Sequence, residues 1–243
     1  MDREVSRIIE NKKLAEGIYK MTLETEESKF TRSGQFAMIG VPGKFLRRPI
    51  SVCYYDSDRY TIIYKVVGEG TEILSKMEPG EIVDSITGCG NGYDVDAIPD
   101  GAYLIAGGIG IPPMLGLMKE LIMQGKSAKV VLGFNTKDDF FLIDEFRYLC
   151  ENIEILTADG SNGRQGFVTD AFARAEYACA CGPTGMLKAL DPKVEKGQFS
   201  LEARMGCGFG ACMGCSINTL EGPMRVCKEG PVFDKEIIEW QKL

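Results

Sequence analysis

Residues 103–113 read YLIAGGIGIPP, a continuous apolar run followed by a glycine turn and two prolines. Such a run is typical of a buried strand in a parallel sheet, and residues 114–123 continue as a helical stretch. The turn at 107–113 is not the G-x-G-x-x-G fingerprint, and no acidic residue follows about twenty positions later. Taken alone, it is either a nucleotide-binding turn or a tight connection between a strand and a helix.

The chain after this stretch alternates between strands and helices. Strands are expected at 128–134, 153–157, 177–181 and 199–204, and helices at 141–149, around 169–175 and from 186 to 190. Residues 232–240 are expected to form a closing strand or turn and a short helix. This alternation predicts a parallel sheet with helices on its faces. Ligands of such sheets bind at the carboxyl ends of the strands, and both glycine turns, at 107–113 and 182–185, follow such ends.

The chain before this stretch reads as short strands separated by turns. Strands rich in β-branched and aromatic residues are expected at 5–9, 18–23, 35–41, 50–55 and 60–67. Thr71 is expected to cap a short helix over 71–77. Many short strands at this spacing predict a closed antiparallel β-barrel.

Two details of this half carry charge. RRPIS (47–51) places a fixed cation and a hydroxyl at the start of a strand, which suits a pyrophosphate or a flavin edge, or equally a solvated basic turn. IYK (63–65) ends another strand, and GEGT (68–71) opens the short helix. Glycines at a helix start can bind an anion through backbone N–H groups, although a plain hairpin turn has the same composition.

The cysteines near the end of the chain have the spacing of an iron–sulfur site. Residues 206–227, GCGFGACMGCSINTLEGPMRVC, contain C-x4-C-x2-C and then eleven residues before a fourth cysteine. This is the plant-type [2Fe–2S] spacing with a shorter last gap, and the glycines let the backbone approach the sulfides. A structural zinc site, which more often uses two short C-x2–4-C pairs, is the alternative.

Composition narrows the function classes. The net charge of −7 argues against nucleic acid and anionic membranes as partners. The absence of histidine excludes Ser-His-Asp catalysis and a Rieske centre, and favours chemistry carried by cofactors. Nine cysteines, with no apolar leader at the N-terminus, favour the reducing cytoplasm over a disulfide framework.

Together these parts resemble the ferredoxin–NADP reductase family, in which a flavin-binding barrel precedes a pyridine-nucleotide domain. RPIS (48–51) is similar to the R-x-[YFI]-[ST] flavin motif of that family, and GGIGIPP (107–113) to its G-G-x-G-x-x-P nucleotide turn. CGP (181–183) is similar to its C-G-P strand end, whose cysteine lies near the nicotinamide. With the cysteines, all of residues 1–243 resemble the electron-transfer subunits of class 1B dihydroorotate dehydrogenase.

The resemblance implies a FAD-binding antiparallel β-barrel over 1–98, an NAD-binding parallel-sheet domain over 99–195 and a [2Fe–2S] cluster-binding region over 196–243. Lys65 stands where relatives more often have arginine, which keeps the charge but loses the bidentate fork. The implied FAD contacts are Arg48, Pro49, Ile50, Ser51, Ile63, Tyr64, Lys65, Gly70 and Thr71; the implied NAD(H) contacts are Gly107, Gly108, Gly110, Gly182 and Pro183, with Cys181 as the catalytic candidate; and the implied cluster ligands are Cys207, Cys212, Cys215 and Cys227.

The implied function is electron transfer in pyrimidine biosynthesis. Electrons would pass from the FMN of a separate catalytic dihydroorotate dehydrogenase subunit, through [2Fe–2S] and FAD, to NAD+, in a cytoplasmic heterotetramer of two plus two chains. FAD fits between the [2Fe–2S] cluster and NAD+ because a flavin exchanges both hydride and single electrons. The alternatives are the small subunit of an NADPH–ferredoxin transhydrogenase or sulfide dehydrogenase complex, and a non-enzymatic zinc-binding interaction module.

Overall fold

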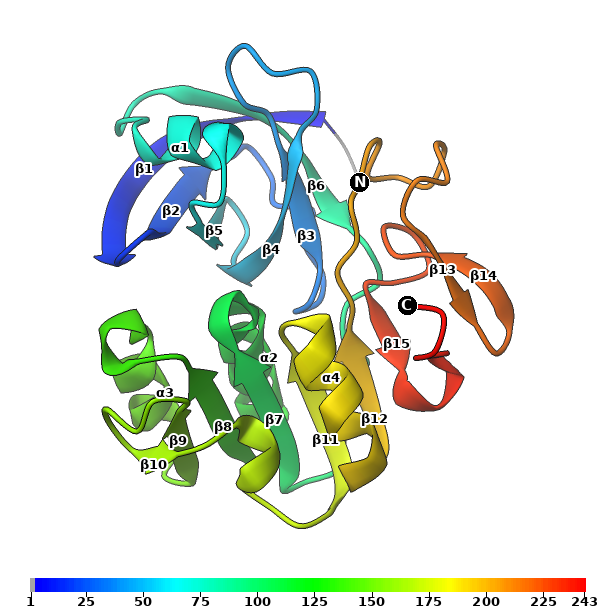
Figure 1. Ribbon diagram of the computed structural model, residues 1–243. Coiled ribbons are helices and arrows are strands. Elements are labelled where there is room, and N and C mark those ends of the chain that lie inside the picture. Colours follow the sequence, from blue (N-terminus) through cyan, green and yellow to red (C-terminus); the bar gives the residue numbers. More distant parts are fainter. Residues whose placement is uncertain (1–2) are drawn as a thin grey trace.

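The computed structural model describes residues 3–243, so the first two residues of the predicted barrel domain lie outside the described residues. A barrel, a sheet covered by helices and a C-terminal segment lie against one another, and Figure 1 shows them at the top, bottom and right. Within the described chain, no helix is long and apolar enough to cross a membrane.

The N-terminal part is a closed antiparallel barrel, as predicted. In the described residues its strand order is β1-β2-β5-β4-β3-β6. Its interior is filled by fully buried apolar side chains such as Met21, Leu23, Ile39 and Ile62. The strands are β1 (Arg3–Ala15), β2 (Ile18–Glu24), β3 (Phe36–Ile39), β4 (Arg48–Tyr55), β5 (Arg59–Lys65) and β6 (Ile82–Cys89).

The barrel differs from the sequence prediction in two elements. β6 was not predicted, because its polar and glycine residues hide an alternating pattern in which Val83 is buried and Ile82 exposed. Thr71 does not cap the short helix α1 (Glu69–Ser75), which starts after Gly68. Its hydroxyl instead accepts the Val67 N–H at 2.9 Å and donates to the Gly68 carbonyl at 3.0 Å, closing the turn from inside the helix.

The central part is a mostly parallel sheet, as predicted. The described strands follow the order β10-β9-β8-β7-β11-β12-β15, with β15 antiparallel to β12. The strands are β7 (Ala102–Gly107), β8 (Ala128–Phe134), β9 (Ile153–Thr157), β10 (Arg164–Gln165), β11 (Ala175–Cys181), β12 (Val194–Ser200) and β15 (Val232–Asp234), and the helices are α2 (Ile111–Met123), α3 (Ile143–Leu149) and α4 (Thr184–Leu190).

Alternate residues of each strand face different helices. Leu104 and Val130 pack with α2 and α3 in one apolar cluster, whereas Ile105 and Val131 pack with α4 in another. Burial on both faces explains why these strands read as continuous apolar runs.

Two elements predicted for this part are wrong. The helix expected around 169–175 is a short 3₁₀ turn, η3 (Val168–Asp170), because the Asp170 carboxylate accepts the Phe167 N–H at 2.8 Å and closes it. The strand expected over 199–204 is β12 and ends at Ser200. Its first half escaped prediction because Glu195, Lys196 and Gly197 interrupt the apolar pattern.

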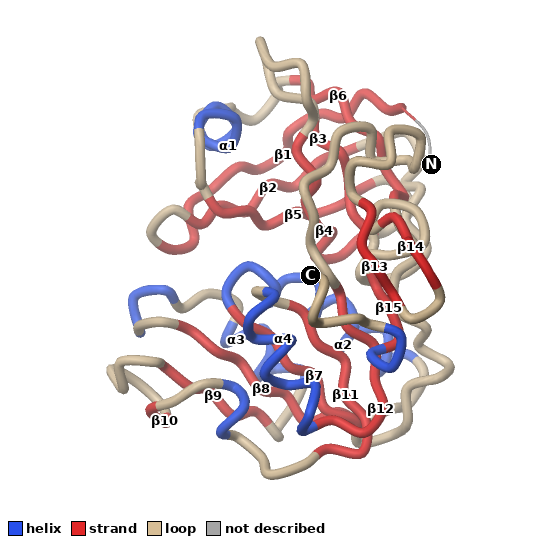
Figure 2. The backbone as a smooth tube through the Cα atoms, turned by 45° about the vertical axis from the view of Figure 1, so that its right-hand side comes forward, coloured by secondary structure: helices blue, strands red, loops and turns tan. Residues whose placement is uncertain are grey.

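The C-terminal part returns to the sheet after a hairpin. The hairpin strands are β13 (Ser216–Thr219) and β14 (Gly222–Arg225), and β15 then pairs with β12. The closing helix predicted before residue 240 is one 3₁₀ turn, η5 (Lys235–Ile237). Figure 2 shows this part running alongside both the barrel and the sheet.

Helix α2 joins the sheet to the barrel through a close backbone contact. A Cβ atom on Gly116 would lie 2.3 Å from the Cys53 carbonyl oxygen of β4. Tyr93 packs in the same apolar cluster as Cys53, and its hydroxyl donates to the Ala180 carbonyl of β11 at 3.0 Å. Both contacts link segments far apart in the chain, so they fix how the barrel sits on the sheet.

Replacing Gly116 by alanine tests this contact. In an open helix interior, alanine stabilises by about 1 kcal/mol relative to glycine. Here the new Cβ would meet backbone that no rotamer change can move, so we expect a net loss of roughly 1–3 kcal/mol in the free energy of unfolding, measured by urea denaturation. Gly185→Ala in α4 is the control, since nothing lies within 4 Å of its Cβ position. Equal destabilisation by both substitutions would contradict the contact.

Candidate functional site

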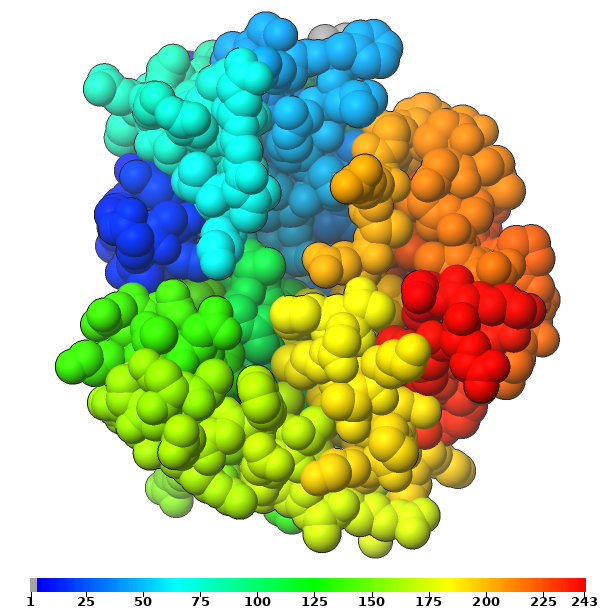
Figure 3. All heavy atoms as spheres, viewed as in Figure 1, coloured from blue at the N-terminus to red at the C-terminus, as the bar shows by residue number. Residues whose placement is uncertain are grey.

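A cavity of about 600 Å³ opens at the carboxyl ends of the parallel strands, where the barrel faces the sheet. Figure 3 shows the surface hollowed where the barrel, the sheet and the C-terminal part meet. The barrel contributes Ile18 and Lys65, the ends of β2 and β5. The sheet side is lined by Gly107, Gly108, Ile109, Gly133, Phe134, Asn135, Asp139, Phe141, Ala158, Gly166, Phe167, Val168, Thr169, Pro183, Gly185, Met186 and Ala189.

The two predicted glycine turns touch each other in this region. A Cβ on Gly110 would lie 2.2 Å from the Cys181 carbonyl oxygen, and a Cβ on Gly107 would lie 2.6 Å from the sulfur of Met186. Gly182, at φ +158°, likewise leaves no room beside the Met186 methyl group. At Gly110 the neighbour is backbone, which cannot move aside, so only a residue without a side chain allows the two turns to approach this closely.

The predicted nucleotide residues are divided between the cavity wall and the layer behind it. Gly107, Gly108 and Pro183 line the cavity, whereas Gly110 and Gly182 do not appear in its wall and instead bring the two turns together. The sequence prediction missed the residues after β8 and β9, including Asn135 and Asp139. The signal that could have found them is the rule already applied to the glycine turns, that strand ends bind ligands.

The Cys181 thiol is buried, and burial raises its pKa to about 12. The neighbouring Ser200 hydroxyl lowers the pKa by less, and the Glu202 carboxylate raises it further. The thiol is therefore neutral at pH 7 and cannot act as a thiolate nucleophile. Cys179 is buried on the same strand, and burial also raises its pKa.

On the barrel, Arg48 and Gly70 form the centre of the predicted flavin site. The Arg48 guanidinium lies against the α1 backbone, so that a Cβ on Gly70 would be 2.5 Å from its Nε and Nη2 atoms. The Arg48 side chain also donates to the Leu46 carbonyl, which fixes it at the start of β4. A cation beside backbone without a side chain suits a phosphate-bearing ligand.

The other predicted flavin residues differ in what they offer. Ile50 and Tyr64 are buried in the barrel core, and the Tyr64 hydroxyl donates to Asn11 at 3.1 Å, so only their backbone can face a ligand. Ile63 packs in the cluster with α2. Pro49 and Lys65 are exposed, Ser51 is half-buried, and the Thr71 hydroxyl is engaged in its own turn.

The four C-terminal cysteines lie as two pairs. The Cys212 N–H donates to the Cys207 sulfur at 3.4 Å, and the Cys227 N–H donates to the Cys215 sulfur at 3.4 Å. Within residues 3–243, no three cysteine or carboxylate side chains converge as the ligands of one ion would. Two cysteine pairs supply the four thiolates that a [2Fe–2S] cluster needs, two for each iron.

The surroundings of these thiols act in opposite directions on Cys207 and Cys227. Burial alone would raise the pKa of Cys207, but backbone N–H groups, led by that of Cys212, lower it to about 6. Burial and the neighbouring Cys215 raise the pKa of Cys227 to about 12. Main-chain N–H groups directed at sulfur are the donors that stabilise bound thiolates.

An arginine holds the ligand-bearing segments together. Arg225 donates to the Gly210 carbonyl at 2.8 Å and pairs with Glu229, so it connects the 207–212 loop to the turn that carries Cys227. On the opposite side, Gly208 packs on Met38 of β3, since a Cβ there would be 2.4 Å from its Cγ. The cysteine loop is therefore fixed against the barrel.

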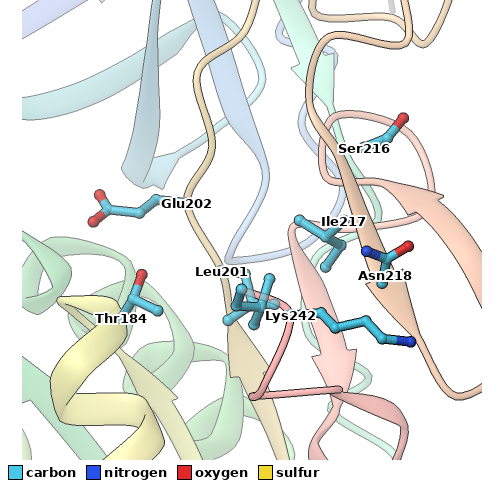
Figure 4. Close-up of a pocket in the computed structure, with 8 residues that line it drawn as sticks. Thr184, Leu201, Glu202, Ser216, Ile217, Asn218 and Lys242 are labelled. Atoms are coloured by element: carbon cyan, nitrogen blue, oxygen red, sulfur yellow. The ribbon is translucent and has the colours of Figure 1, made fainter.

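A second cavity, of about 300 Å³, lies between α4 and the β13–β14 hairpin. Figure 4 shows Thr184 and Glu202 on one side, and Leu201, Ile217, Asn218 and Lys242 on the other. Thr184 belongs to the strand-end turn of β11, so the hairpin region and the nucleotide turn are close neighbours.

Comparison with protein families matches two regions of the chain. Residues 104–191 match the oxidoreductase NAD-binding domain, and residues 202–239 match the iron–sulfur cluster binding domain of dihydroorotate dehydrogenase B.

Relatives match the chain along nearly its whole length. The chain is 40% identical over 246 residues to the "Dihydroorotate dehydrogenase B (NAD(+)), electron transfer subunit" of Bacillus pumilus, covering 94% of this chain and 95% of that one. It is 37% identical over 240 residues to the Clostridium perfringens protein of the same name, covering 96% and 97%.

Solved structures share the fold. The structure of an NADH-dependent reduced ferredoxin-NADP oxidoreductase, studied for flavin-based electron bifurcation, has a TM-score of 0.88 at 29% identity, covering 97% of this chain and 90% of that one. Phthalate dioxygenase reductase, with a TM-score of 0.69 at 18% identity and coverage of 88% and 86%, shares the fold.

The cysteine pairs predict the effect of single substitutions. Replacing Cys207, Cys212, Cys215 or Cys227 by serine is expected to remove most bound iron and acid-labile sulfide, because a serine hydroxyl is a poor replacement for a thiolate. The measurement is iron, sulfide and zinc content per chain, with the visible absorption spectrum. Cys150→Ser should keep the wild-type content, since Cys150 is buried and its thiol donates to the Ala128 carbonyl at 3.2 Å. A wild-type protein that binds zinc and no iron would contradict the prediction.

Proposed function

Because the chain belongs to the family of dihydroorotate dehydrogenase B electron-transfer subunits, we propose that it passes electrons from a catalytic dihydroorotate dehydrogenase subunit to NAD+. Its own cofactors are FAD, a [2Fe–2S] cluster and NAD(H). The product of the partner reaction feeds pyrimidine biosynthesis. The chain is thus one component of an NAD-dependent oxidoreductase.

One observation supports this function above the others: barrel and sheet share a single cavity. Lys65, at the end of β5, lines the same cavity as the Gly107–Gly108 turn. A flavin held along β4 and β5 therefore faces a nucleotide held on the sheet, which is the arrangement that hydride transfer needs.

We assign the cofactors to residues as follows. Arg48 and the Gly70 backbone, with Ser51 and Lys65, hold FAD by its phosphates and ring edge, and the backbone of β4 and β5 borders it. The Gly107–Gly108 backbone and Pro183 hold NAD(H). The cysteine pairs Cys207–Cys212 and Cys215–Cys227 hold the cluster. Bound FAD supplies the exchange between hydride and single electrons, and the protein supplies position and electrostatics.

Cys181 is assigned a role in shape and not in proton transfer. Its neutral thiol lies behind the two glycine turns, and its carbonyl packs against Gly110. We propose that this packing sets the floor of the nicotinamide pocket. Lys65, with a compact charge in place of an arginine fork, would attract a phosphate without imposing a bidentate geometry.

The partner is the catalytic subunit implied by the family. We propose that it carries FMN, that two copies of each chain assemble, and that the complex works in the cytoplasm, where thiols stay reduced. The cysteine loop supports this arrangement, because Phe209 and Met213 are 44% and 53% exposed beside the ligands and offer apolar surface for docking.

A second candidate function keeps the cofactors and changes the partner. The similarity at TM-score 0.88 to an NADH-dependent reduced ferredoxin-NADP oxidoreductase supports a transhydrogenase-type small subunit. The higher identity to dihydroorotate dehydrogenase subunits, 40% over nearly the whole chain, favours the first proposal.

Arg48→Ala tests the flavin assignment. Losing a charge-assisted contact to phosphate should weaken FAD binding roughly 10- to 100-fold, measured as flavin retained after dialysis and as the dissociation constant on reconstitution. Arg59→Ala is the matched control, since Arg59 lies at the far end of β5 and pairs with Glu24 at 3.6 Å. Full flavin retention by Arg48→Ala would count against the assignment.

The partner is tested by anaerobic co-purification of the tagged chain from its native cell. We expect a flavin-containing second chain and dihydroorotate-dependent reduction of NAD+, lost when the two chains are separated. A complex with flavin and iron but without this activity would move the function to the transhydrogenase or sulfide dehydrogenase type. Zinc without flavin or iron would overturn both.

A further inference from the structure

A carboxylate on the nucleotide side accepts hydrogen bonds from the barrel. Glu120, near the end of α2, accepts the Ser33 N–H at 2.8 Å and the Ser33 hydroxyl at 2.9 Å. The Tyr55 hydroxyl donates to the same Oε1 atom at 3.2 Å. Ser33 precedes β3 and Tyr55 ends β4, so every one of these donors belongs to the barrel, 65 or 87 residues away in sequence.

The carboxylate lies at the far end of the helix that begins at the nucleotide turn. Helix α2 starts at Ile111, immediately after the Gly108–Gly110 turn, and spans thirteen residues, or about 20 Å. Between its ends, Gly116 packs on β4, and the Lys119 ammonium sits 4.1 Å from the centre of the Tyr54 ring. One rigid helix therefore connects the backbone that faces the nucleotide to the strand that starts at Arg48.

The contact is not an ordinary surface pair. Ser33 is 2% exposed, so removing its acceptor would leave a buried N–H and hydroxyl without that partner. Burial raises the pKa of Glu120, and the Ser33 and Tyr55 donors and the nearby Arg32 cation oppose that shift. A carboxylate kept here at the cost of desolvation is compatible with a role in fixing geometry.

We propose that Glu120 is a positioning residue that holds the nucleotide-binding sheet at a fixed distance and angle from the flavin strands, and so sets the rate of hydride transfer without contributing to nucleotide binding. The inference rests on the proposed function, because it presupposes flavin on the barrel and NAD(H) on the sheet. Two packed domains rotate relative to each other by default unless their interface holds them. Hydride transfer requires reacting atoms about 3–3.5 Å apart, and a displacement near 1 Å can cost about 100-fold in rate.

The chain provides a matched control for this carboxylate. Asp100 accepts the Ser127 N–H at 2.7 Å and the Ser127 hydroxyl at 2.8 Å, both on one oxygen. Residues 100 and 127 both precede strands of the sheet, β7 and β8, so this contact lies within the nucleotide domain. Asp100→Ala removes the same kind of acceptor without touching the barrel.

The experiment compares Glu120→Ala, Glu120→Gln, Tyr55→Phe and Asp100→Ala in the flavin-loaded protein. Anaerobic stopped-flow reduction of the flavin by NADH gives a limiting rate and an NADH dissociation constant. We expect Glu120→Ala to lower the limiting rate by roughly tenfold or more while the dissociation constant stays within about threefold. Glu120→Gln, which keeps an acceptor oxygen, and Tyr55→Phe, which removes one donor, should show smaller losses of rate. Asp100→Ala should match the wild type.

Hydrogen exchange at Ser33 provides a readout independent of activity. The peptide that contains the Ser33 amide should exchange faster in Glu120→Ala and at the wild-type rate in Asp100→Ala. Tyr55→Phe keeps the inference testable if Glu120→Ala fails to retain flavin. A limiting rate for Glu120→Ala equal to that of Asp100→Ala, or a loss confined to the dissociation constant, would overturn the inference. A wild-type flavin that NADH does not reduce would instead overturn the proposed function.

Discussion

Backbone-to-backbone approach at glycine is the constraint on which the arrangement of this protein depends. At Gly110 the two nucleotide turns meet, and at Gly116 helix α2 meets strand β4 of the barrel. Any side chain at either position would push apart the surfaces that the cavity needs close together. The hydrogen bonds across the junction, from Ser33 and Tyr55 to Glu120, reach ordinary lengths where Gly116 lets α2 approach the barrel backbone closely.

Burial and local side-chain contacts decide which elements the sequence could predict. The parallel strands were predictable because burial on both faces leaves continuous apolar runs, as at 128–134 and 153–157. The turns at 107–113 and 182–185 were predictable as turns because clustered glycine and proline end the apolar runs before them. β6 was missed because its buried face carries Ser85 and Thr87, so burial leaves no apolar alternation in the sequence, and Gly88 interrupts the strand pattern. The helix expected near 169–175 was wrong because the Asp170 side chain closes a 3₁₀ turn there.

Sequence motifs identify some residues of the candidate sites, whereas the fold alone brings the others together. Cysteine spacing identifies the thiols of the C-terminal loop but not their pairing, which depends on how β14 and the following turn bring Cys227 back to Cys215. The flavin motif identifies Arg48, but only the fold brings its guanidinium against Gly70. Asp139 and Glu120 carry no motif. Asp139 lines the cavity because the parallel strands all end at one edge of the sheet. Glu120 accepts a hydrogen bond from Ser33 because the fold brings together two segments that lie 87 residues apart.

The titratable groups indicate which work the polypeptide leaves to its cofactors. The chain has no histidine, and burial raises the pKa of Cys53, Cys89 and Cys181 to about 12, so these thiols are neutral at pH 7. None of these three thiols can exchange a proton at neutral pH, so they contribute packing and not proton transfer.

The four cysteines of the C-terminal loop differ in exposure. Cys215 and Cys227 are buried, whereas Cys212 is exposed and Cys207 half-buried. A partner chain can therefore approach one pair from outside while the other faces the protein interior. A site for passing electrons between two chains requires such an asymmetry, whereas a purely structural metal site, which is normally closed by its ligands, does not.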